Sequence, residues 1–198
     1  MLYLGIDPDL HALAVAVWDH EAGPVTALVV EAKRRKAVVE NYAVLDMVKA
    51  IYVGAHEATN RLDWIEGIAV ESQELKRSGN RQHKRPQDIV TLGQVGGAAL
   101  MAFAMLCPQA KSWFPKPSEW KGDVQKAAMQ AALYTDLGWG YELVRPKSRS
   151  KLPGRAPAKA EYARPLRPSE GFDHVEPADW KHVGDALLLA RWASRQTK

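Results

Sequence analysis

Residues 2–30 read LYLGIDPDLHALAVAVWDHEAGPVTALVV, and this stretch decides the fold. It predicts an apolar strand over 2–7 and a second over 13–18, separated by the turn-forming sequence Asp-Pro-Asp. A third strand is expected over 25–30, after the turn residues Glu-Ala-Gly-Pro. Because consecutive strands with such short connections pair antiparallel, residues 2–30 predict a three-stranded antiparallel meander.

The rest of the sequence alternates between strand-like and helix-like patterns. This alternation predicts an α/β fold, in which the meander is extended by parallel strands into a mixed sheet flanked by helices. In chain order we expect a helix over 37–57, a strand over 62–70, a helix over 88–106, a short strand over 111–114, a helix over 123–137 capped by Asp123, and a helix over 178–195.

Composition is that of one globular domain over residues 1–198, with 46% hydrophobic and 25% charged residues. The single cysteine, Cys107, excludes an internal disulfide and a cysteine-cluster metal site. No apolar stretch reaches the roughly 20 residues that span a bilayer, and no secretion signal opens the sequence. We therefore expect a cytoplasmic protein, in a bacterium or a phage-infected host cell.

Basic charge is concentrated in two segments of a chain whose net charge is +4. Residues 74–88 carry +3 and residues 145–173 carry +5, which leaves −4 for the remainder. The second segment holds five prolines and lacks an apolar period, so we expect a loop or disordered insert there. Two solvated surface segments would be the simpler explanation, but their charge favours a nucleic-acid partner.

Three carboxylates and a histidine follow predicted strands or open a predicted helix. Asp7 ends the first strand, Glu71 follows the strand over 62–70, and His182 and Asp185 share one face of the last helix at i, i+3 spacing. Taken singly, Asp7 could form a turn and Glu71 could belong to a surface salt bridge. His182 and Asp185 could be a pair that opens a helix. Together they suit Mg²⁺, which prefers carboxylate oxygens, and the cleavage of phosphodiesters.

Four sequence blocks resemble, in order and spacing, those of RuvC-type Holliday junction resolvases, which belong to the RNase H-like superfamily. The blocks read LGIDPDLHALAVAV, IAVESQ, LGQVGGAAL and HVGDALLLARWA, and they span residues 4–193. The resemblance implies an RNase H-like sheet and a homodimeric endonuclease that resolves four-way junctions by paired symmetric nicks. It further implies two Mg²⁺ or Mn²⁺ ions per active site and products with 5′-phosphate and 3′-hydroxyl ends.

The same resemblance implies roles for individual residues. The catalytic, metal-binding set would be Asp7, Glu71, His182 and Asp185, with His182 as a ligand or a proton shuttle. Lys121 resembles a lysine that contacts the cleaved strand. Surface solubility is the alternative for both Lys121 and Lys126. The residues expected to bind DNA are Lys76, Arg77, Arg81, Lys84, Arg85, Lys121 and Lys126.

The sequence departs from the family pattern at two functional positions. Asp9 stands where relatives have a turn glycine, and we expect its side chain to face solvent, with a fourth carboxylate near the metals as the alternative. Glu74 stands where relatives carry an aromatic side chain that disrupts base pairing, which leaves Leu75 as a weak substitute. These departures, together with the basic insert, suggest a phage-borne member.

The helix over 88–106 has no charged residue between Ile89 and Leu106. A helix that is apolar all round is buried, either in the core of one chain or between two chains. Gly93, Gly96 and Gly97 would allow another backbone to approach closely. By resemblance, we expect this helix to form the homodimer interface.

Three other functions compete with junction resolution. The same fold could act on flaps, replication forks or RNA–DNA hybrids. LGIDPD also resembles the phosphate-binding turn of sugar kinases and actin-like ATPases, but the sequence lacks their second glycine-rich turn. A catalytically inactive DNA-binding module is disfavoured because all four proposed ligand positions are filled.

Overall fold

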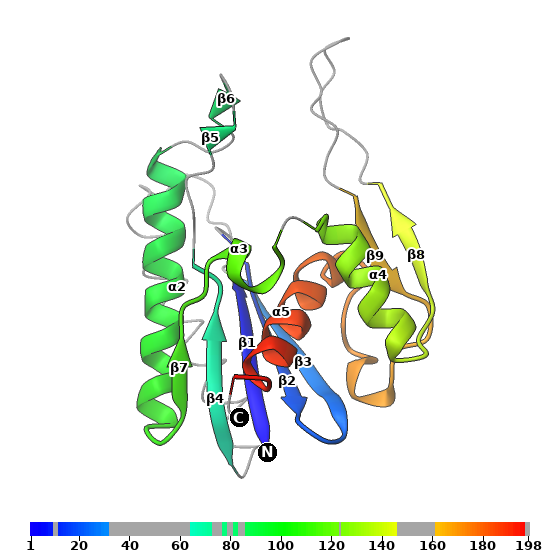
Figure 1. The fold of residues 1–198 in the computed structure, drawn as a ribbon, viewed down its shortest axis with the longest axis horizontal. Coiled ribbons are helices and arrows are strands. Elements are labelled where there is room, and N and C mark those ends of the chain that lie inside the picture. Colours follow the sequence, from blue (N-terminus) through cyan, green and yellow to red (C-terminus); the bar gives the residue numbers. More distant parts are fainter. Residues whose placement is uncertain are drawn as a thin grey trace.

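The structure is a computed structural model with a five-stranded mixed sheet at its centre, in the order β3-β2-β1-β4-β7 (Figure 1). It describes residues 1–9, 12–31, 64–72, 77–78, 81–82, 86–122, 124–145 and 161–196. The strands are β1 (Leu2–Pro8), β2 (Ala12–Asp19), β3 (Gly23–Glu31), β4 (Ile65–Val70) and β7 (Lys111–Trp113). Strands β1, β2 and β3 pair antiparallel, whereas β4 runs parallel to β1 and β7 parallel to β4. The predicted α/β fold with an antiparallel meander and added parallel strands is confirmed.

Two helices cover opposite faces of this sheet. Helix α2 (Pro86–Leu106) packs on the face that carries Leu4 and Ile6, and helix α5 (Trp180–Ala193) packs on the other. A Cβ atom at Gly5 would collide with the backbone of Ala186, so α5 lies directly against the β1 backbone. This close approach fixes the position of α5 across the sheet. None of the described helices is long and apolar enough to span a membrane.

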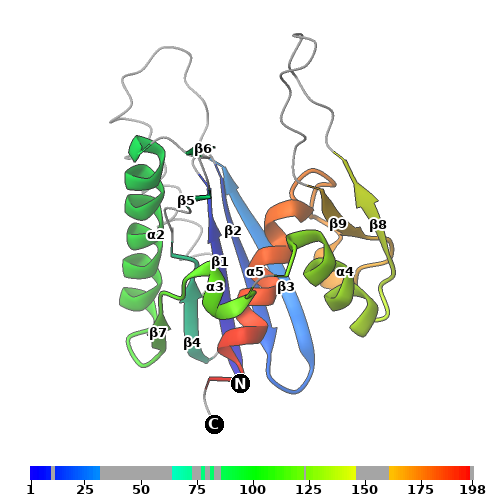
Figure 2. The same cartoon turned by 45° about the horizontal axis from the view of Figure 1, so that its top comes forward.

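A smaller group of elements lies beside α5 (Figures 1 and 2). It contains α4 (Lys126–Asp136) and the hairpin of β8 (Tyr141–Val144) with β9 (Tyr162–Pro165), followed by the 3₁₀ helix η1 (Glu170–Phe172). The short helix α3 (Pro117–Trp120) connects β7 to this group. A second hairpin, β5 (Arg77–Ser78) with β6 (Arg81–Gln82), lies beyond the end of β4.

The expectation of a loop throughout residues 145–173 is wrong for its second half. Strand β9 and η1 lie there, and Tyr162, Ala163 and Phe172 are buried in the core around α5. The ring of Phe172 contacts that of Trp139, with 5.2 Å between their centroids. These apolar residues are too few and too scattered to form a period in the sequence, but each packs against residues distant in the chain. Residues 146–160 lie outside the described part.

The other predicted elements that lie in the described residues agree closely with the observed bounds, apart from the start of α4. The burial of α2 also differs from that of a helix in the core of one chain. Helix α4 begins at Lys126 rather than at position 123, and the predicted cap Asp123 is outside the described residues, as is the helix over 37–57. Helix α2 is not buried on all sides within the chain, because Met101 and Met105 are exposed. Among the described residues the sheet covers one side of α2, which leaves apolar side chains such as Met101 and Met105 exposed on the other.

Candidate metal centre

Asp7 and Glu71 lie side by side because β1 and β4 are parallel neighbours. Ile6 pairs with Val70, and the Glu71 amide donates a hydrogen bond to the Ile6 carbonyl at 3.0 Å. The strands therefore carry both carboxylates to the same edge of the sheet. Each side chain is buried, with Asp7 6% and Glu71 7% exposed.

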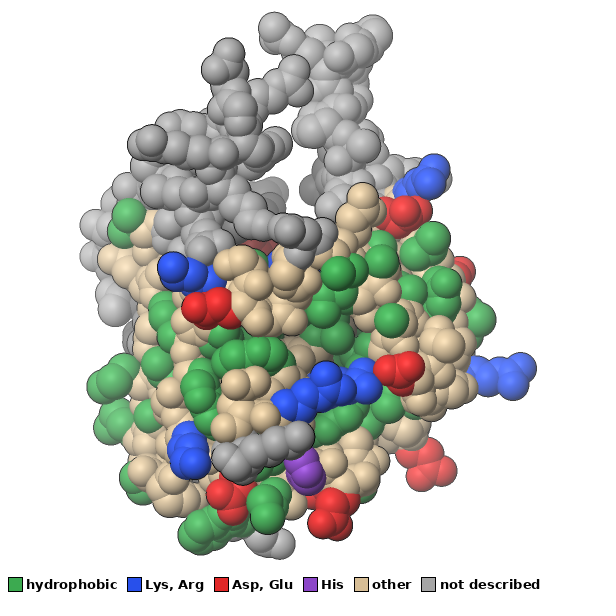
Figure 3. All heavy atoms as spheres, viewed as in Figure 1, with side chains coloured by type: hydrophobic (Ala, Val, Ile, Leu, Met, Phe, Trp, Pro, Cys, Tyr) green, Lys and Arg blue, Asp and Glu red, His purple; other side chains and the backbone are tan. Residues whose placement is uncertain are grey.

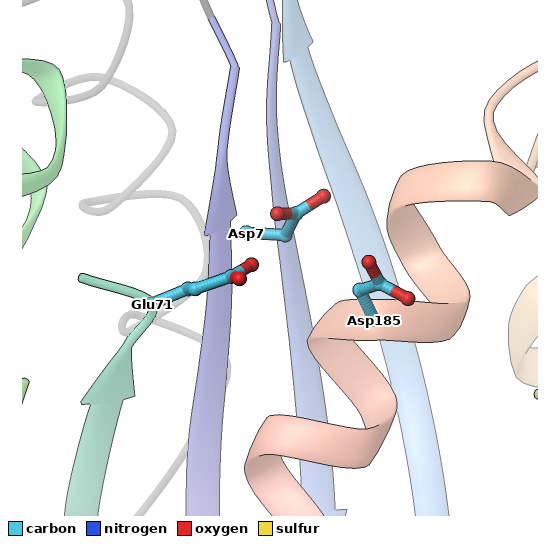
Figure 4. A group of neighbouring side chains, drawn as sticks. All are labelled: Asp7, Glu71 and Asp185. Atoms are coloured by element: carbon cyan, nitrogen blue, oxygen red, sulfur yellow. The ribbon is translucent and has the colours of Figure 1, made fainter. Parts of the chain in front are cut away.

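Asp185 approaches the same edge from helix α5. The three carboxylates of Asp7, Glu71 and Asp185 each offer an oxygen, and these atoms all lie within 4.8 Å of one another. Figure 4 shows the Asp7 and Glu71 side chains both extending from the sheet toward helix α5, which carries Asp185. Asp185 is 4% exposed, so all three carboxylates are largely removed from solvent.

His182 contacts this cluster through Asp7. Its Nδ1–H donates a hydrogen bond to Oδ2 of Asp7 at 2.9 Å, and its Nε2 lies 3.4 Å from Oδ2 of Asp9. The Asp9 side chain is 42% exposed, as expected, and it also borders the site, which agrees with its alternative place as a further carboxylate near the cluster. Among the described residues, the converging group consists of Asp7, Glu71 and Asp185, with the imidazole at its margin.

Two lysines turn toward the carboxylates from the chain around α4. Nζ of Lys126 lies 2.5 Å from Oδ2 of Asp185, and Nζ of Lys121 lies 3.5 Å from Oε1 of Glu71. Lys121 also lies over the Trp120 ring, 4.8 Å from its centroid. Both lysines were expected at the DNA, and the structure brings both to the edge that carries the acidic cluster.

The remaining predicted DNA-binding residues are described only in part. Lys76, Lys84 and Arg85 lie outside the described residues, and Arg77 and Arg81 are described in their backbone, within β5 and β6. This hairpin lies beyond the end of β4, the strand that Glu71 follows (Figure 2). Their role in DNA binding stays a prediction.

The electrostatics of the cluster favour a cation. Burial, together with the charge of Asp7, raises the pKa of Glu71 to about 8. Burial also raises the pKa of Asp185, against the opposing charge of Lys126. Burial acts in the same direction on Asp7, but the hydrogen bond with His182 and the charge of Lys126 lower its pKa overall. A pKa of about 8 favours the protonated form of Glu71 at neutral pH, and a bound cation would favour its carboxylate form.

The donor set fits a hard divalent cation. The converging atoms are carboxylate oxygens, which are suitable ligands for Mg²⁺ and Mn²⁺. The cluster lies at the carboxyl ends of the parallel strands β1 and β4. The side chains that would hold the cation are those of Asp7, Glu71 and Asp185, and His182 lies within reach of Asp7.

Known structures share this architecture. A scan against protein-family models and a search of curated proteins find no match. RuvC of Thermus thermophilus, solved in complex with a Holliday junction substrate, is 19% identical, with a TM-score of 0.58 over 96% of this chain and 91% of that chain. A second Thermus thermophilus RuvC structure is 20% identical, with a TM-score of 0.56 over 96% of this chain and 92% of that chain. The chain has the RuvC fold. The resemblance found in the sequence is thus confirmed at the level of the fold.

Within this RuvC fold, one residue at the acidic cluster was missed in the sequence. Gln130 is fully buried, and its Nε2 donates a hydrogen bond to Oδ1 of Asp185 at 2.8 Å. The only local signal was its spacing of four residues from Lys126, which places both on one face of α4. That spacing is common in helices, so it singles out neither residue without the contact to Asp185.

Proposed function

We propose that this protein is a divalent-metal-dependent endonuclease that cuts branched DNA and resolves four-way junctions. The observation that carries this proposal is the buried group of Asp7, Glu71 and Asp185 at the sheet edge of a RuvC fold. The structural neighbour was solved with a Holliday junction substrate, which supports the same substrate class here. Cleavage would leave 5′-phosphate and 3′-hydroxyl ends.

In the proposed reaction, Asp7, Glu71 and Asp185 hold Mg²⁺ or Mn²⁺, with two ions expected per site. A bound divalent cation supplies Lewis-acid chemistry, which activates water and neutralises charge on the phosphodiester. His182, oriented by its hydrogen bond to Asp7, holds or moves a proton at Nε2. Lys121 and Lys126 would bind phosphate oxygens of the cleaved strand.

Basic side chains would bind the rest of the DNA through its phosphates. Residues 74–88 and 145–173 carry +3 and +5; the first segment contains the β5–β6 hairpin, and the second follows β8 and contains β9. Contacts of this kind give affinity without reading bases. Branch geometry, rather than sequence, would then select the substrate.

The exposed face of α2 supports a homodimer. Val90, Met101 and Met105 are 53%, 62% and 69% exposed, and hydrophobic side chains reach the surface along this edge of the molecule (Figure 3). A Cβ atom at Gly93 or Gly97 would meet nothing within 4 Å. These two glycines therefore serve no packing within the described part of the chain, and they would let a second α2 approach closely. Gly96 differs, because it faces the ring of Phe114 in its own chain.

A cleavage assay tests the proposal directly. Wild-type protein is incubated with a mobile four-way junction, a flap, an RNA–DNA hybrid and a linear duplex, with Mg²⁺, with Mn²⁺ or with EDTA. We expect metal-dependent paired nicks in the junction, and a rate at least about a hundredfold lower for Asp7→Asn, which should still bind junction.

Glu21→Gln is the matched control, because Glu21 is an exposed turn residue between β2 and β3, outside the cluster and both basic segments, and it should cut at the wild-type rate. Faster cutting of flaps or hybrids than of junctions would redefine the substrate within the same fold. Undiminished nicking by Asp7→Asn would remove the metal-site assignment.

A further inference from the structure

Gln130 connects three elements around the acidic cluster, and both donor and acceptor groups of its amide are used. Its Nε2 donates to Oδ1 of Asp185 at 2.8 Å and to the Lys181 carbonyl at 3.2 Å, both on α5. Its Oε1 accepts a hydrogen bond from the Ala163 amide of β9 at 3.0 Å. Since the side chain is fully buried, water does not compete for these bonds.

The backbone of β9 determines which way this amide points. The Ala163 N–H can only donate, so it requires the oxygen of Gln130 on its side. The NH₂ group is then directed toward Asp185, which as a carboxylate can only accept. The hydrogen bond from β9 therefore presents a donor, rather than an acceptor, to the acidic cluster.

Helix α4 holds both oxygens of Asp185. Gln130 binds Oδ1, while Lys126, one turn earlier, lies 2.5 Å from Oδ2. The amide is neutral and its bond is fixed by β9, whereas the Lys126 side chain is 28% exposed and has a flexible stem. When Oδ2 turns to a cation, the bond from Gln130 to Oδ1 can stay in place.

Gly184 leaves the space that this arrangement needs. A Cβ atom there would lie 2.5 Å from the Tyr134 hydroxyl and 2.8 Å from Nε2 of Gln130. Any other residue at position 184 would force the Tyr134 hydroxyl and the Gln130 amide to shift. The absence of a side chain at Gly184 therefore leaves room on α5 for the Gln130 amide next to Asp185.

We propose that Gln130 is a positioning residue, which fixes the Asp185 carboxylate so that its second oxygen is presented to the cation. This inference rests on the function proposed above. It also gives the folded half of the 145–173 segment a role, because β9 orients the amide that holds the ligand.

The test compares two nearly isosteric variants. Gln130→Met removes both the donor and the acceptor. Gln130→Glu keeps an acceptor for Ala163 N–H but places against Asp185 a carboxyl group that can donate only while it is protonated, so its turnover is measured at pH 9 as well as at pH 7. Gln109→Glu, at an exposed turn residue that follows α2, adds the same charge away from the site. Mn²⁺ binding without DNA is measured by calorimetry, and junction cutting is measured at saturating Mn²⁺.

We expect Gln130→Met to bind Mn²⁺ about 10- to 100-fold more weakly, the range found for groups that orient metal ligands. Turnover at saturating Mn²⁺ should fall at least about tenfold in both Gln130 variants, with junction binding in EDTA and the Gln109→Glu control unchanged. Wild-type turnover in Gln130→Glu at pH 9 would mean that Gln130 only anchors β9, and would overturn the proposal. Mn²⁺ affinity within about twofold of wild type in folded Gln130→Met would overturn it as well.

If Gln130→Met does not fold, Gln130→Glu still decides the matter, because it preserves the bond to β9. The metal readout needs no substrate. A wild type that binds Mn²⁺ but cuts no junction would therefore remove the proposed function alone, while the Mn²⁺ comparison would still test Gln130.

Discussion

At the scale of single residues, the negative charge of the buried acidic cluster is partly offset by neighbouring basic side chains. Buried carboxylates are costly unless they are paired or bind metals. Here Lys126 and Lys121 lie near Asp185 and Glu71, and His182 is bonded to Asp7. Burial, together with the charges of Asp7 and Asp185, still raises the pKa of Glu71 to about 8, against the opposing charge of Lys121.

The pKa of Glu71 leads to a prediction for stability in the absence of metal. A carboxyl whose pKa rises from 4.5 to about 8 on folding contributes stability that is fully present below pH 4.5 and lost as pH rises through 8. Glu71→Gln resembles the protonated form, so in EDTA at pH 9 it should be about 1–3 kcal/mol more stable than wild type. Denaturant unfolding at pH 5 and pH 9 measures the difference, which should vanish at pH 5.

Glu21→Gln, at an exposed turn residue between β2 and β3, should show no such difference between the two pH values. Added Mn²⁺ should stabilise wild type more than Glu71→Gln. A Glu71→Gln protein that is less stable than wild type at pH 9 without metal would contradict the charge argument.

His182 allows a second prediction at this scale. Aspartate can replace imidazole as a ligand or a proton acceptor beside Asp7, whereas alanine can do neither. His182→Asp should therefore retain substantial junction cutting with Mg²⁺, and the cutting rate of His182→Ala should fall at least about a hundredfold. Single-turnover cleavage rates measure this, with folding checked by circular dichroism. Wild-type rates in both variants would leave His182 with a structural role.

At the scale of elements, α4 and the β8–β9 hairpin show how segments outside the four RuvC-like sequence blocks can enter the site. Helix α4 contributes Lys126 and Gln130, and β9 fixes the amide through Ala163. Both elements also pack in the core around α5, with Tyr162 and Leu133 among its buried residues. The hairpin is therefore part of the domain rather than an appendage to it.

The segment around β5–β6 is predicted to bind DNA through phosphates. Replacing Arg81, Lys84 and Arg85 by glutamine should flatten the dependence of log K on log salt, by roughly one for each phosphate that is no longer bound. Filter binding or fluorescence anisotropy of a junction over a salt series measures the slope. Lys111→Gln is the control, because this exposed lysine begins β7 at the opposite end of the sheet. An unchanged slope in the triple variant would exclude this segment from the DNA interface.

At the scale of the whole molecule, one site cuts one strand, whereas junction resolution needs two symmetric nicks. A two-fold dimer supplies two identical sites. The face of α2 that carries Met101 and Met105 is the surface available for it, since the sheet covers the opposite face. The proposed activity and the exposed apolar helix are thus explained together.

Gly97→Glu tests this dimer without disturbing the fold, because the space around Gly97 is open within the described part of the chain. An unpaired charge in the interface should yield monomers in sedimentation at micromolar concentration, with paired junction cutting abolished and slow flap nicking retained. Ala132→Glu, on the exposed face of α4, should remain dimeric. A wild type that sediments as a monomer while it resolves junctions would rule the dimer out.

The sequence by itself determined the elements whose patterns are local. Apolar runs between turn residues predicted β1, β2 and β3, and the long uncharged run predicted α2. Strand ends also located Asp7 and Glu71, since a strand that ends in a carboxylate brings it to the edge of the sheet. Such features depend on backbone geometry and neighbouring residues, which a single sequence contains.

Only the tertiary structure decided which distant groups meet. The bond from Gln130 to Asp185 joins residues 55 positions apart, and the bond from Ala163 to Gln130 spans 33 positions. Neither hydrogen bond produces a periodic pattern in the sequence. Strand β9 has no apolar period either, because its few apolar residues stand among prolines and basic side chains. Likewise, the exposure of one α2 face depends on which side the sheet covers. Burial and hydrogen-bond pairing are properties of the packed chain, so these features of the site emerge only when α4, α5 and β9 come together.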